Sequence, residues 1–272
     1  MTELPAYVMG QTDEERQRLI QQSSYLSPLT ELMLREGGLG PGMSVLDIGC
    51  GTGGASQIAA RIVGKSGCVV GIDRDEETLN QARQLAAQAK LNHISFQCCT
   101  AETARFDSKF DAVIGRFVLI HQKDPLAVVR QVVPFARRGG LVAFLEPDFT
   151  PRPLSWPRVE IFERMCGHIT ELFVHTSLPH DMGLRLRKTL HDAGVRELRQ
   201  EIDTIVSSGP DSSIFSWLAA TIGSIAPKLE ALGITTLAAI DLSTLEARLR
   251  TESAALAAHV QMFPIVAAWG RT

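Results

Sequence analysis

The sequence lacks clustered basic residues and long apolar runs. Its net charge is −3, and no run of Lys or Arg is longer than the pair Arg137 and Arg138. Nucleic acid is not expected as a partner, because binding to its phosphates requires clustered basic residues. No stretch of about 18 uncharged apolar residues occurs, and residues 1–19 show no basic segment leading into an apolar core. We therefore expect a cytoplasmic protein with no membrane span.

Metal-binding patterns are missing as well. The five cysteines include no CxxC pair, and the histidines include no HxxxH pair. Free thiols are the simplest expectation for such cysteines in a reducing compartment. Cys98 and Cys99 are adjacent, but neighbours in a strand point to opposite faces, so we expect packing rather than redox chemistry. The sequence predicts no metal site.

Short apolar segments alternate with helix-like segments through the first half of the chain. The predicted strands are "SVLDIG", "CVVGID", "HISFQC", "FDAVIG" and "GLVAFLE". Asp124 followed by Pro125 is typical of a helix start. Strands and helices that alternate at this spacing form parallel βαβ units. The predicted fold class is therefore α/β, with a doubly wound, mostly parallel sheet.

The remainder of the chain is predicted to flank this core. Residues 1–38 read as a helical cap interrupted near Pro28, and 39–149 as the ligand-binding core. Residues 150–272 contain a strand, "VRELRQEIDTIV", and helical insertions at about 150–180 and 207–258. Trp156 to His175 has a helix-like pattern, and Ser243 with Glu246 forms a capping-box pattern. Pro264 in the last apolar run indicates an edge strand or a bulge.

The segment "VLDIGCGTGG" carries glycines in the GxGxxG spacing of a nucleotide-binding loop, at Gly49, Gly51 and Gly54. A dinucleotide would place its pyrophosphate on the following helix N-terminus. Asp47 immediately before the loop would then add negative charge beside negative charge. A ligand with an ammonium and a sulfonium fits this carboxylate better, and S-adenosylmethionine is such a ligand.

At these residues the sequence resembles the class I S-adenosylmethionine-dependent methyltransferases. Asp47 and the loop glycines match the first motif of that family, and Asp73 matches the acidic residue for the ribose hydroxyls. Thr100 departs from the acidic or amide residue usual after the third strand, which leaves backbone contacts at Ala101. The resemblance implies a seven-stranded methyltransferase fold, S-adenosylmethionine as cofactor and S-adenosylhomocysteine as product. The implied cofactor-binding residues are Asp47, Gly49, Gly51, Gly53, Asp73, Arg74, Thr100, Ala101, Arg116 and Tyr25.

A further resemblance extends to both ends of the chain. "YVMGQTDEERQRL", "LSPLT" and "AWGR" are similar to bacterial small-molecule methyltransferases related to the quinone-biosynthesis type. In that group the N-terminal helices cover the cofactor, so Tyr7 and Tyr25 are expected either to contact ligand or to pack the cap. The last strand is expected to run antiparallel between the fifth and sixth strands. The implied reaction is methylation of a small acceptor, at oxygen or nitrogen ahead of carbon.

Three side chains are candidates for acid–base work on the acceptor. His121 follows the fourth strand, Glu146 ends the fifth, and His175 shares a helix face with His168, seven residues before it. Each has a structural alternative: helix packing or capping for His121, capping for Glu146, and a solvated face for His175. Phe162, Met165, Phe173, Phe215, Trp217 and Ile222 in the insertions are expected to line an acceptor pocket or to pack the lid or a homodimer face.

Other functions share some of these features. A nicotinamide oxidoreductase would use the GxGxxG loop and Asp73, but Asp47 and the missing Tyr-x-x-x-Lys pair oppose it. A non-catalytic S-adenosylmethionine-binding protein would need the same loop. An enzyme of this fold with chemistry other than methyl transfer is a further alternative.

Overall fold

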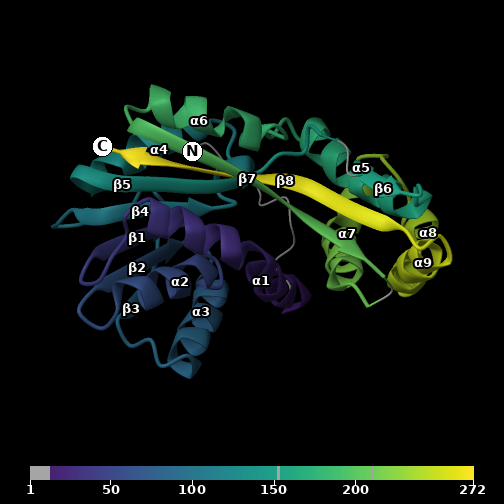
Figure 1. The fold of residues 1–272 in the computed structure, drawn as a ribbon, viewed down its shortest axis with the longest axis horizontal. Coiled ribbons are helices and arrows are strands. Elements are labelled where there is room, and N and C mark those ends of the chain that lie inside the picture. The colour runs from purple at the N-terminus through teal and green to yellow at the C-terminus, as the bar shows by residue number, and fades with distance from the viewer. Residues whose placement is uncertain (1–12, 152–153, 210) are drawn as a thin grey trace.

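The computed structural model describes residues 13–151, 154–209 and 211–272, which form a sheet with helices on both faces (Figure 1). The strands are β1 (Ser44–Ile48), β2 (Cys68–Asp73), β3 (Ile94–Cys98), β4 (Phe110–Arg116), β5 (Ala136–Pro147), β6 (Leu154–Trp156), β7 (Arg196–Ser208) and β8 (His259–Arg271). The α-helices are α1 (Asp13–Glu36), α2 (Gly54–Val63), α3 (Glu76–Gln88), α4 (Pro125–Val132), α5 (Glu160–His175), α6 (Met182–Asp192), α7 (Ser213–Ala231), α8 (Leu237–Ile240) and α9 (Leu242–Ala255). Two 3₁₀ turns are η1 (Leu119–His121) and η2 (Val133–Phe135).

The sheet has the predicted doubly wound topology. Its strand order is β3-β2-β1-β4-β5-β8-β6, and β7 pairs with β8. The strands β1 to β5 pair in parallel, while β8 runs antiparallel to β5 and β7 and lies between them. Chain order reverses between β1 and β4, and ligands bind at the carboxyl ends of the strands beside such a reversal. The predicted fold class and the antiparallel last strand are both confirmed.

Pro264 does not place β8 at an edge, contrary to one of the two expectations for it. The strand pairs with β5 from Ile265 to Arg271, and it pairs with β7 on its other side. The register with β7 shifts between Thr204 and Val206, next to Pro264. The shift lies where the proline lacks an N–H for the ladder, so the alternative expectation of a bulge is confirmed.

The helix α1 runs through Pro28 without the predicted interruption. A proline inside a helix costs about 3 kcal/mol, because one hydrogen bond is lost and the ring crowds the preceding turn. Pro28 faces solvent, while Leu26, Met33 and Leu34 on the same helix are buried against α2 and the sheet. Their burial, worth about 1.5–3 kcal/mol for each side chain, offsets the proline.

Two further boundaries differ from the sequence prediction. The helix expected from Trp156 begins only at Glu160, because Pro157 favours an extended residue before it, and β6 ends there. The expected cap at Ser243 is wrong, since Asp241 precedes α9 and its carboxylate accepts a 2.7 Å hydrogen bond from the Ser243 hydroxyl.

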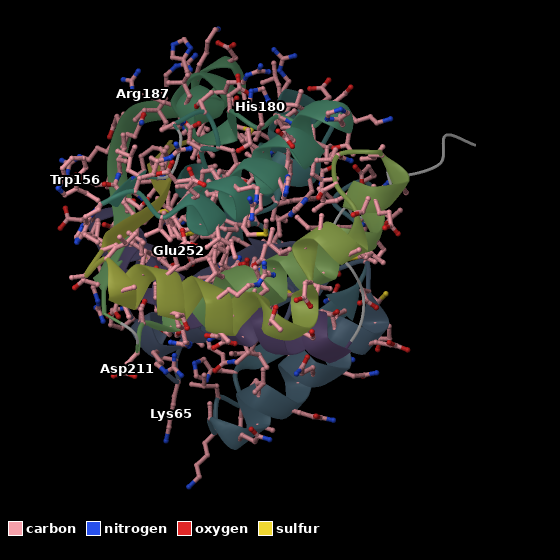
Figure 2. The ribbon with its side chains drawn as sticks, turned by 90° about the vertical axis from the view of Figure 1, so that its right-hand side faces the viewer. Lys65, Trp156, His180, Arg187, Asp211 and Glu252 are labelled. Carbon is pink, nitrogen blue, oxygen red and sulfur yellow. The ribbon has the colours of Figure 1, made fainter. Side chains whose placement is uncertain are left out.

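Helices cover the two faces of the sheet unequally. The helices α1 and α2 pack with β1, β4 and β5 in one apolar cluster, and α4 to α7 pack in a larger one on the other face. Figure 2 looks onto α7 and α9, which extend this second layer; Glu252 on α9 accepts a 2.9 Å hydrogen bond from the backbone N–H of Glu160 on α5. None of the described helices is long and apolar enough to cross a membrane.

Candidate active site

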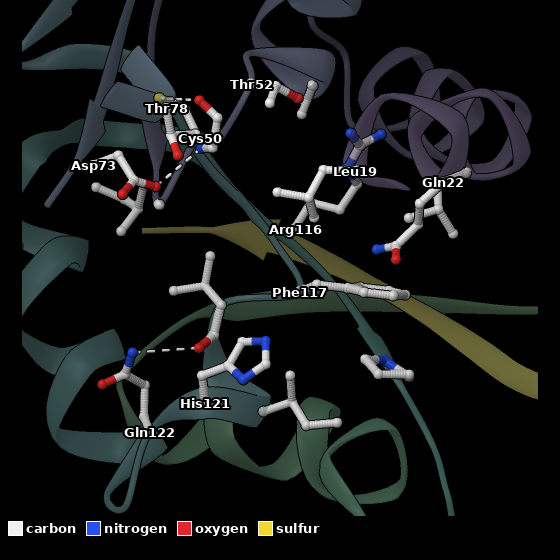
Figure 3. Close-up of a pocket in the computed structure, with 18 of the residues that line it drawn as sticks. Leu19, Gln22, Cys50, Thr52, Asp73, Thr78, Arg116, Phe117, His121 and Gln122 are labelled. Carbon is white, nitrogen blue, oxygen red and sulfur yellow. Dashed lines mark hydrogen bonds between the residues drawn. The ribbon is translucent and has the colours of Figure 1, made fainter. Parts of the chain in front are cut away.

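A cavity of about 290 Å³ opens at the carboxyl ends of β1, β2 and β4, which is where the topology predicts a ligand. The helix α1 forms one wall through Gln22 and Tyr25, and α5, α7 and β8 close the far end through Phe173, Trp217 and Phe263. Figure 3 shows Asp73 and Arg116 on one side of Phe117 and His121 on the other. Tyr7, for which the same alternative roles as for Tyr25 were predicted, lies outside the described residues.

The glycine loop between β1 and α2 forms the floor of the cavity. Gly49 and Gly53 have φ of +60° and +79°, which only glycine adopts readily. A Cβ at Gly49 would lie 2.8 Å from Val118 Cγ2, and one at Gly53 would lie 2.9 Å from Phe96 Cζ. Gly49 and Gly51 line the cavity, whereas Gly53 lies behind it and lets α2 approach Phe96.

Asp47 lines the cavity, and one of its carboxylate oxygens has no hydrogen-bond donor among the described residues. Its side chain is buried, and Oδ2 accepts a 2.5 Å hydrogen bond from Ser56 Oγ. No group in the described part of the chain donates to the buried Oδ1. Burial raises the pKa of Asp47 to about 6, against the opposing effects of Ser56 and Arg116. A buried acceptor left in this state fits a cationic ligand group such as the ammonium of S-adenosylmethionine.

Asp73 ends β2 next to the loop. Its Oδ2 accepts from the Gly51 N–H at 3.0 Å and its Oδ1 from the Asp75 N–H at 3.1 Å. Burial raises its pKa, and these backbone donors limit the rise. Each carboxylate oxygen keeps a lone pair for a further donor, so the arrangement fits a pair of ribose hydroxyls. Arg74 also lines the cavity.

Thr100 and Ala101 follow β3 and line the same side of the cavity. The Thr100 hydroxyl lies 3.3 Å from that of Thr103, and its backbone N–H donates to Thr103 Oγ1 at 3.0 Å. These bonds within the turn hold the segment in place. The structure places both predicted residues at the cavity wall.

Arg116 joins the sheet to the cap helix. From the end of β4 its guanidinium donates to Ser23 Oγ at 3.0 Å and to Thr30 Oγ1 at 3.4 Å, both on α1. Burial lowers its pKa to about 10, and the charge of Asp47 opposes this. A side chain at Gly54 would overlap Ser23 and Arg116, so Gly54 is needed for close approach of α1. No local sequence pattern predicts the contact between Arg116 and Ser23, which lie 93 residues apart.

The three predicted catalytic side chains separate in the structure. His121 lines the cavity, and burial together with the charges of Arg18 and Arg74 lowers its pKa to about 3. Glu146 is fully buried outside the cavity lining, and its carboxylate accepts hydrogen bonds of 2.8–3.1 Å from the N–H groups of Val118, Leu119 and Ile120. His175 faces solvent at the end of α5, and its Nδ1 lies 2.9 Å from the Glu171 carbonyl.

The positions of Glu146 and His175 have simple physical causes. Glu146 points toward the turn after β4 and satisfies three backbone donors there, so it acts as a cap rather than as a group that faces ligand. The seven-residue spacing of His168 and His175 correctly places the two side chains on one face of α5. The buried face of that helix is occupied by its apolar residues instead. The structure therefore leaves His121 as the one of these three that reaches the cavity.

Aromatic rings form the far end of the cavity. Phe149 makes edge contacts with two other rings, and the distances between ring centroids are 5.0 Å to Phe173 and 4.7 Å to Phe263. Of the apolar residues predicted for the pocket, Phe173 and Trp217 line it. The others belong to the core: Phe162, Met165, Phe215 and Ile222.

Sequence reasoning missed Phe117 and Gln22. Phe117 has a φ of +57°, unusual for a bulky residue, and lines the cavity directly after Arg116. A positive φ at a residue other than glycine has no simple signal in the sequence. Gln22 faces the cavity from α1, where helical periodicity alone does not show which polar residues look inward.

Comparisons with known proteins identify relatives of part of the chain. Aklanonic acid methyltransferase DauC of Streptomyces sp. (strain C5) is 38% identical over 109 residues, which are 40% of this chain and 50% of that protein. Demethylmenaquinone methyltransferase of Shouchella clausii is 31% identical over 125 residues, 46% of this chain and 50% of that protein. The chain thus spans about half the length of these curated relatives.

The fold is shared more widely. The crystal structure of the YcgJ protein from Bacillus subtilis aligns with a TM-score of 0.59 at 15% identity, covering 89% of this chain and 97% of that one. Residues 39–194 match a family model described as a methyltransferase domain, and S-adenosylmethionine is the cofactor implied by that family. The match covers more than half of the chain, which therefore belongs to the methyltransferase domain family.

Proposed function

We propose that the protein transfers a methyl group from S-adenosylmethionine to an oxygen, or a nitrogen, of a small aromatic or hydrophobic molecule. The observation that carries the proposal is the buried Oδ1 of Asp47, which lies beside the glycine loop and has no donor among the described residues, in a cavity whose far end is aromatic. The similarity to methyltransferases named for aklanonic acid and demethylmenaquinone supports a small acceptor.

The cofactor would be held by groups that already face the cavity. Asp47 suits the ammonium, Asp73 the ribose hydroxyls, and Thr100 with Ala101 the edge of the adenine. S-adenosylmethionine supplies an electrophilic methyl group on a sulfonium. The protein then has to hold the acceptor atom in line with that methyl group and to exclude water.

His121 is suited to orient an acceptor hydroxyl. Its lowered pKa keeps the imidazole neutral at physiological pH, so a ring nitrogen accepts a hydrogen bond. Such a weak base does not ionise a phenol beforehand. A hydroxyl becomes strongly acidic as its oxygen acquires the methyl group, and at that stage His121 takes the proton.

Glu146 and Arg116 would position the two segments beside the reacting groups, which are the turn after β4 and the helix α1. Glu146 holds the N–H groups of the turn that carries His121. Arg116 holds α1 over the cavity through Ser23 and Thr30. We assign no proton transfer to Glu146 or to His175, because neither lines the cavity.

An acceptor screen tests the proposal. The purified protein is incubated with S-adenosylmethionine and a panel of phenols, enols and aromatic amines, and both the methylated product and S-adenosylhomocysteine are measured by mass spectrometry. We expect equal amounts of the two products from at least one acceptor, and His121→Ala to lower kcat about 100-fold for a hydroxyl acceptor. Full turnover by His121→Ala would remove His121 from the reaction, and absence of any methylated product would contradict methyl transfer.

A further inference from the structure

The amide of Gln22 is locked in one orientation at the cavity wall. Its Oε1 accepts hydrogen bonds from the guanidinium of Arg18, one turn earlier on α1, and from Trp217 Nε1 on α7 at 3.4 Å. All three side chains line the cavity. The contact therefore connects α1 to α7 across 195 residues of sequence.

Both neighbours of this oxygen can only donate. A guanidinium has five N–H groups and no acceptor, and an indole has a single N–H. Turning the amide over would set its NH₂ group against two donors, so the oxygen must face Arg18 and Trp217. The NH₂ group of Gln22 is consequently directed elsewhere, and no side chain or backbone group of the described chain accepts from it.

This NH₂ group faces the cavity opposite a hydrogen-bond acceptor. Figure 3 shows the amide of Gln22 entering from α1 and the ring of His121 entering from the other wall, with Phe117 between them. His121 is held by η1, and its ring lies 5.9 Å from that of Phe173. The cavity thus offers a fixed donor on one wall and a neutral imidazole on another, with aromatic rings at its end.

We propose that Gln22 determines acceptor specificity by donating to a carbonyl oxygen, so that the acceptors are hydroxylated aromatic or enolic ketones rather than simple phenols. The inference rests on the proposed function, since it assigns the methyl-accepting hydroxyl to His121 and the carbonyl to Gln22. An acceptor without the carbonyl would leave the Gln22 NH₂ group buried without a partner, which is unfavourable.

Binding to the protein saturated with S-adenosylhomocysteine tests this directly. The probes are the positional isomers of hydroxyfluorenone and the matching hydroxyfluorenes, which differ only in a carbonyl against a methylene. By isothermal titration, we expect at least one hydroxyfluorenone to bind about tenfold more tightly than its partner. Gln22→Leu should abolish this preference. Gln22→Glu, which keeps the shape and presents an oxygen to the ligand carbonyl, should do the same.

Gln21→Leu is the matched control. Gln21 precedes Gln22 on α1 and also bonds to α7, through Ser216 Oγ at 3.0 Å, but it does not line the cavity. This variant should keep the wild-type preference. Equal affinities for every probe pair in the wild type, or a preference that survives in Gln22→Leu, would overturn the inference.

Two further results separate the possible failures. If Gln22→Leu weakens binding of S-adenosylhomocysteine tenfold and leaves the carbonyl preference intact, the amide serves the cofactor and the inference is wrong. The titrations require no turnover. A carbonyl preference that depends on Gln22 therefore supports the specificity assignment even where methyl transfer to these probes is not observed, and the acceptor screen tests the reaction separately.

Discussion

Glu146 Oε1 and the backbone N–H of Leu119 form a 2.8 Å hydrogen bond that joins the end of β5 to the turn after β4. The same carboxylate accepts from Val118 and Ile120. Through these bonds a fully buried residue with no access to the cavity controls the backbone that carries His121.

The first prediction concerns the pH dependence of stability. Burial raises the pKa of Glu146 from 4.5 to about 7. The folded protein keeps this proton to higher pH than the unfolded chain, so the contribution of Glu146 to stability falls as pH rises from about 4.5 to 7. Glu146→Gln removes this titration. Relative to the variant, the wild type should lose up to about 3 kcal/mol between pH 5 and 8, measured by urea unfolding. A difference that does not change with pH would contradict the assignment.

The second prediction concerns the charge of His121. With a folded-state pKa of about 3, against 6.5 for an ordinary histidine, the ring should stay neutral from pH 8 to pH 5. The unfolded chain binds the proton first, so this residue lowers stability as pH falls below about 6.5. The ring-proton resonance of His121, identified by its loss in His121→Ala, should not shift over that range. A titration midpoint near pH 6.5 would show that the ring is solvated.

The third prediction tests the seating of α1. Gly54→Ala places a methyl group against Ser23 and Arg116, so α1 must move away from the glycine loop. We expect at least tenfold weaker binding of S-adenosylhomocysteine and faster proteolysis within α1. Gly167→Ala is the control, because beyond its chain neighbours and the backbone of its own helix turn a Cβ there would meet no described atom within 4 Å, and Ala is favoured over Gly in a helix by about 1 kcal/mol. Equal cofactor affinity in the two variants would show that α1 does not depend on this contact.

Features set by neighbouring residues could be predicted from the sequence. The run from Asp47 through Gly53 combines a strand, a tight turn and a helix start within a few residues. Asp73 is predicted in the same way, because it is the last residue of the next strand. Asp124 before Pro125 caps α4, as its local pattern indicates; its side chain accepts from the Ala127 N–H at 3.0 Å. These features depend on backbone geometry that a short stretch of chain determines by itself.

Features set by distant contacts could not be predicted. Gln22 acquires its orientation from Trp217, 195 residues away, and Arg116 finds its partner Ser23 across 93 residues. Glu146 was correctly placed at the end of a strand, but the direction of its carboxylate depends on the turn after β4. The continuous path of α1 through Pro28 likewise reflects burial against the sheet, which outweighs a local preference.

The central claim is that Asp47 and the glycine loop hold S-adenosylmethionine rather than a dinucleotide. Isothermal titration with S-adenosylhomocysteine and, separately, with NADH tests it most directly, using the wild type, Asp47→Ala and the exposed-site control Glu31→Gln. We predict binding of S-adenosylhomocysteine tighter than about 100 μM, weakened at least tenfold in Asp47→Ala, unchanged in Glu31→Gln, and no binding of NADH. Binding of NADH in place of S-adenosylhomocysteine, or an affinity unaffected by Asp47→Ala, would contradict the account.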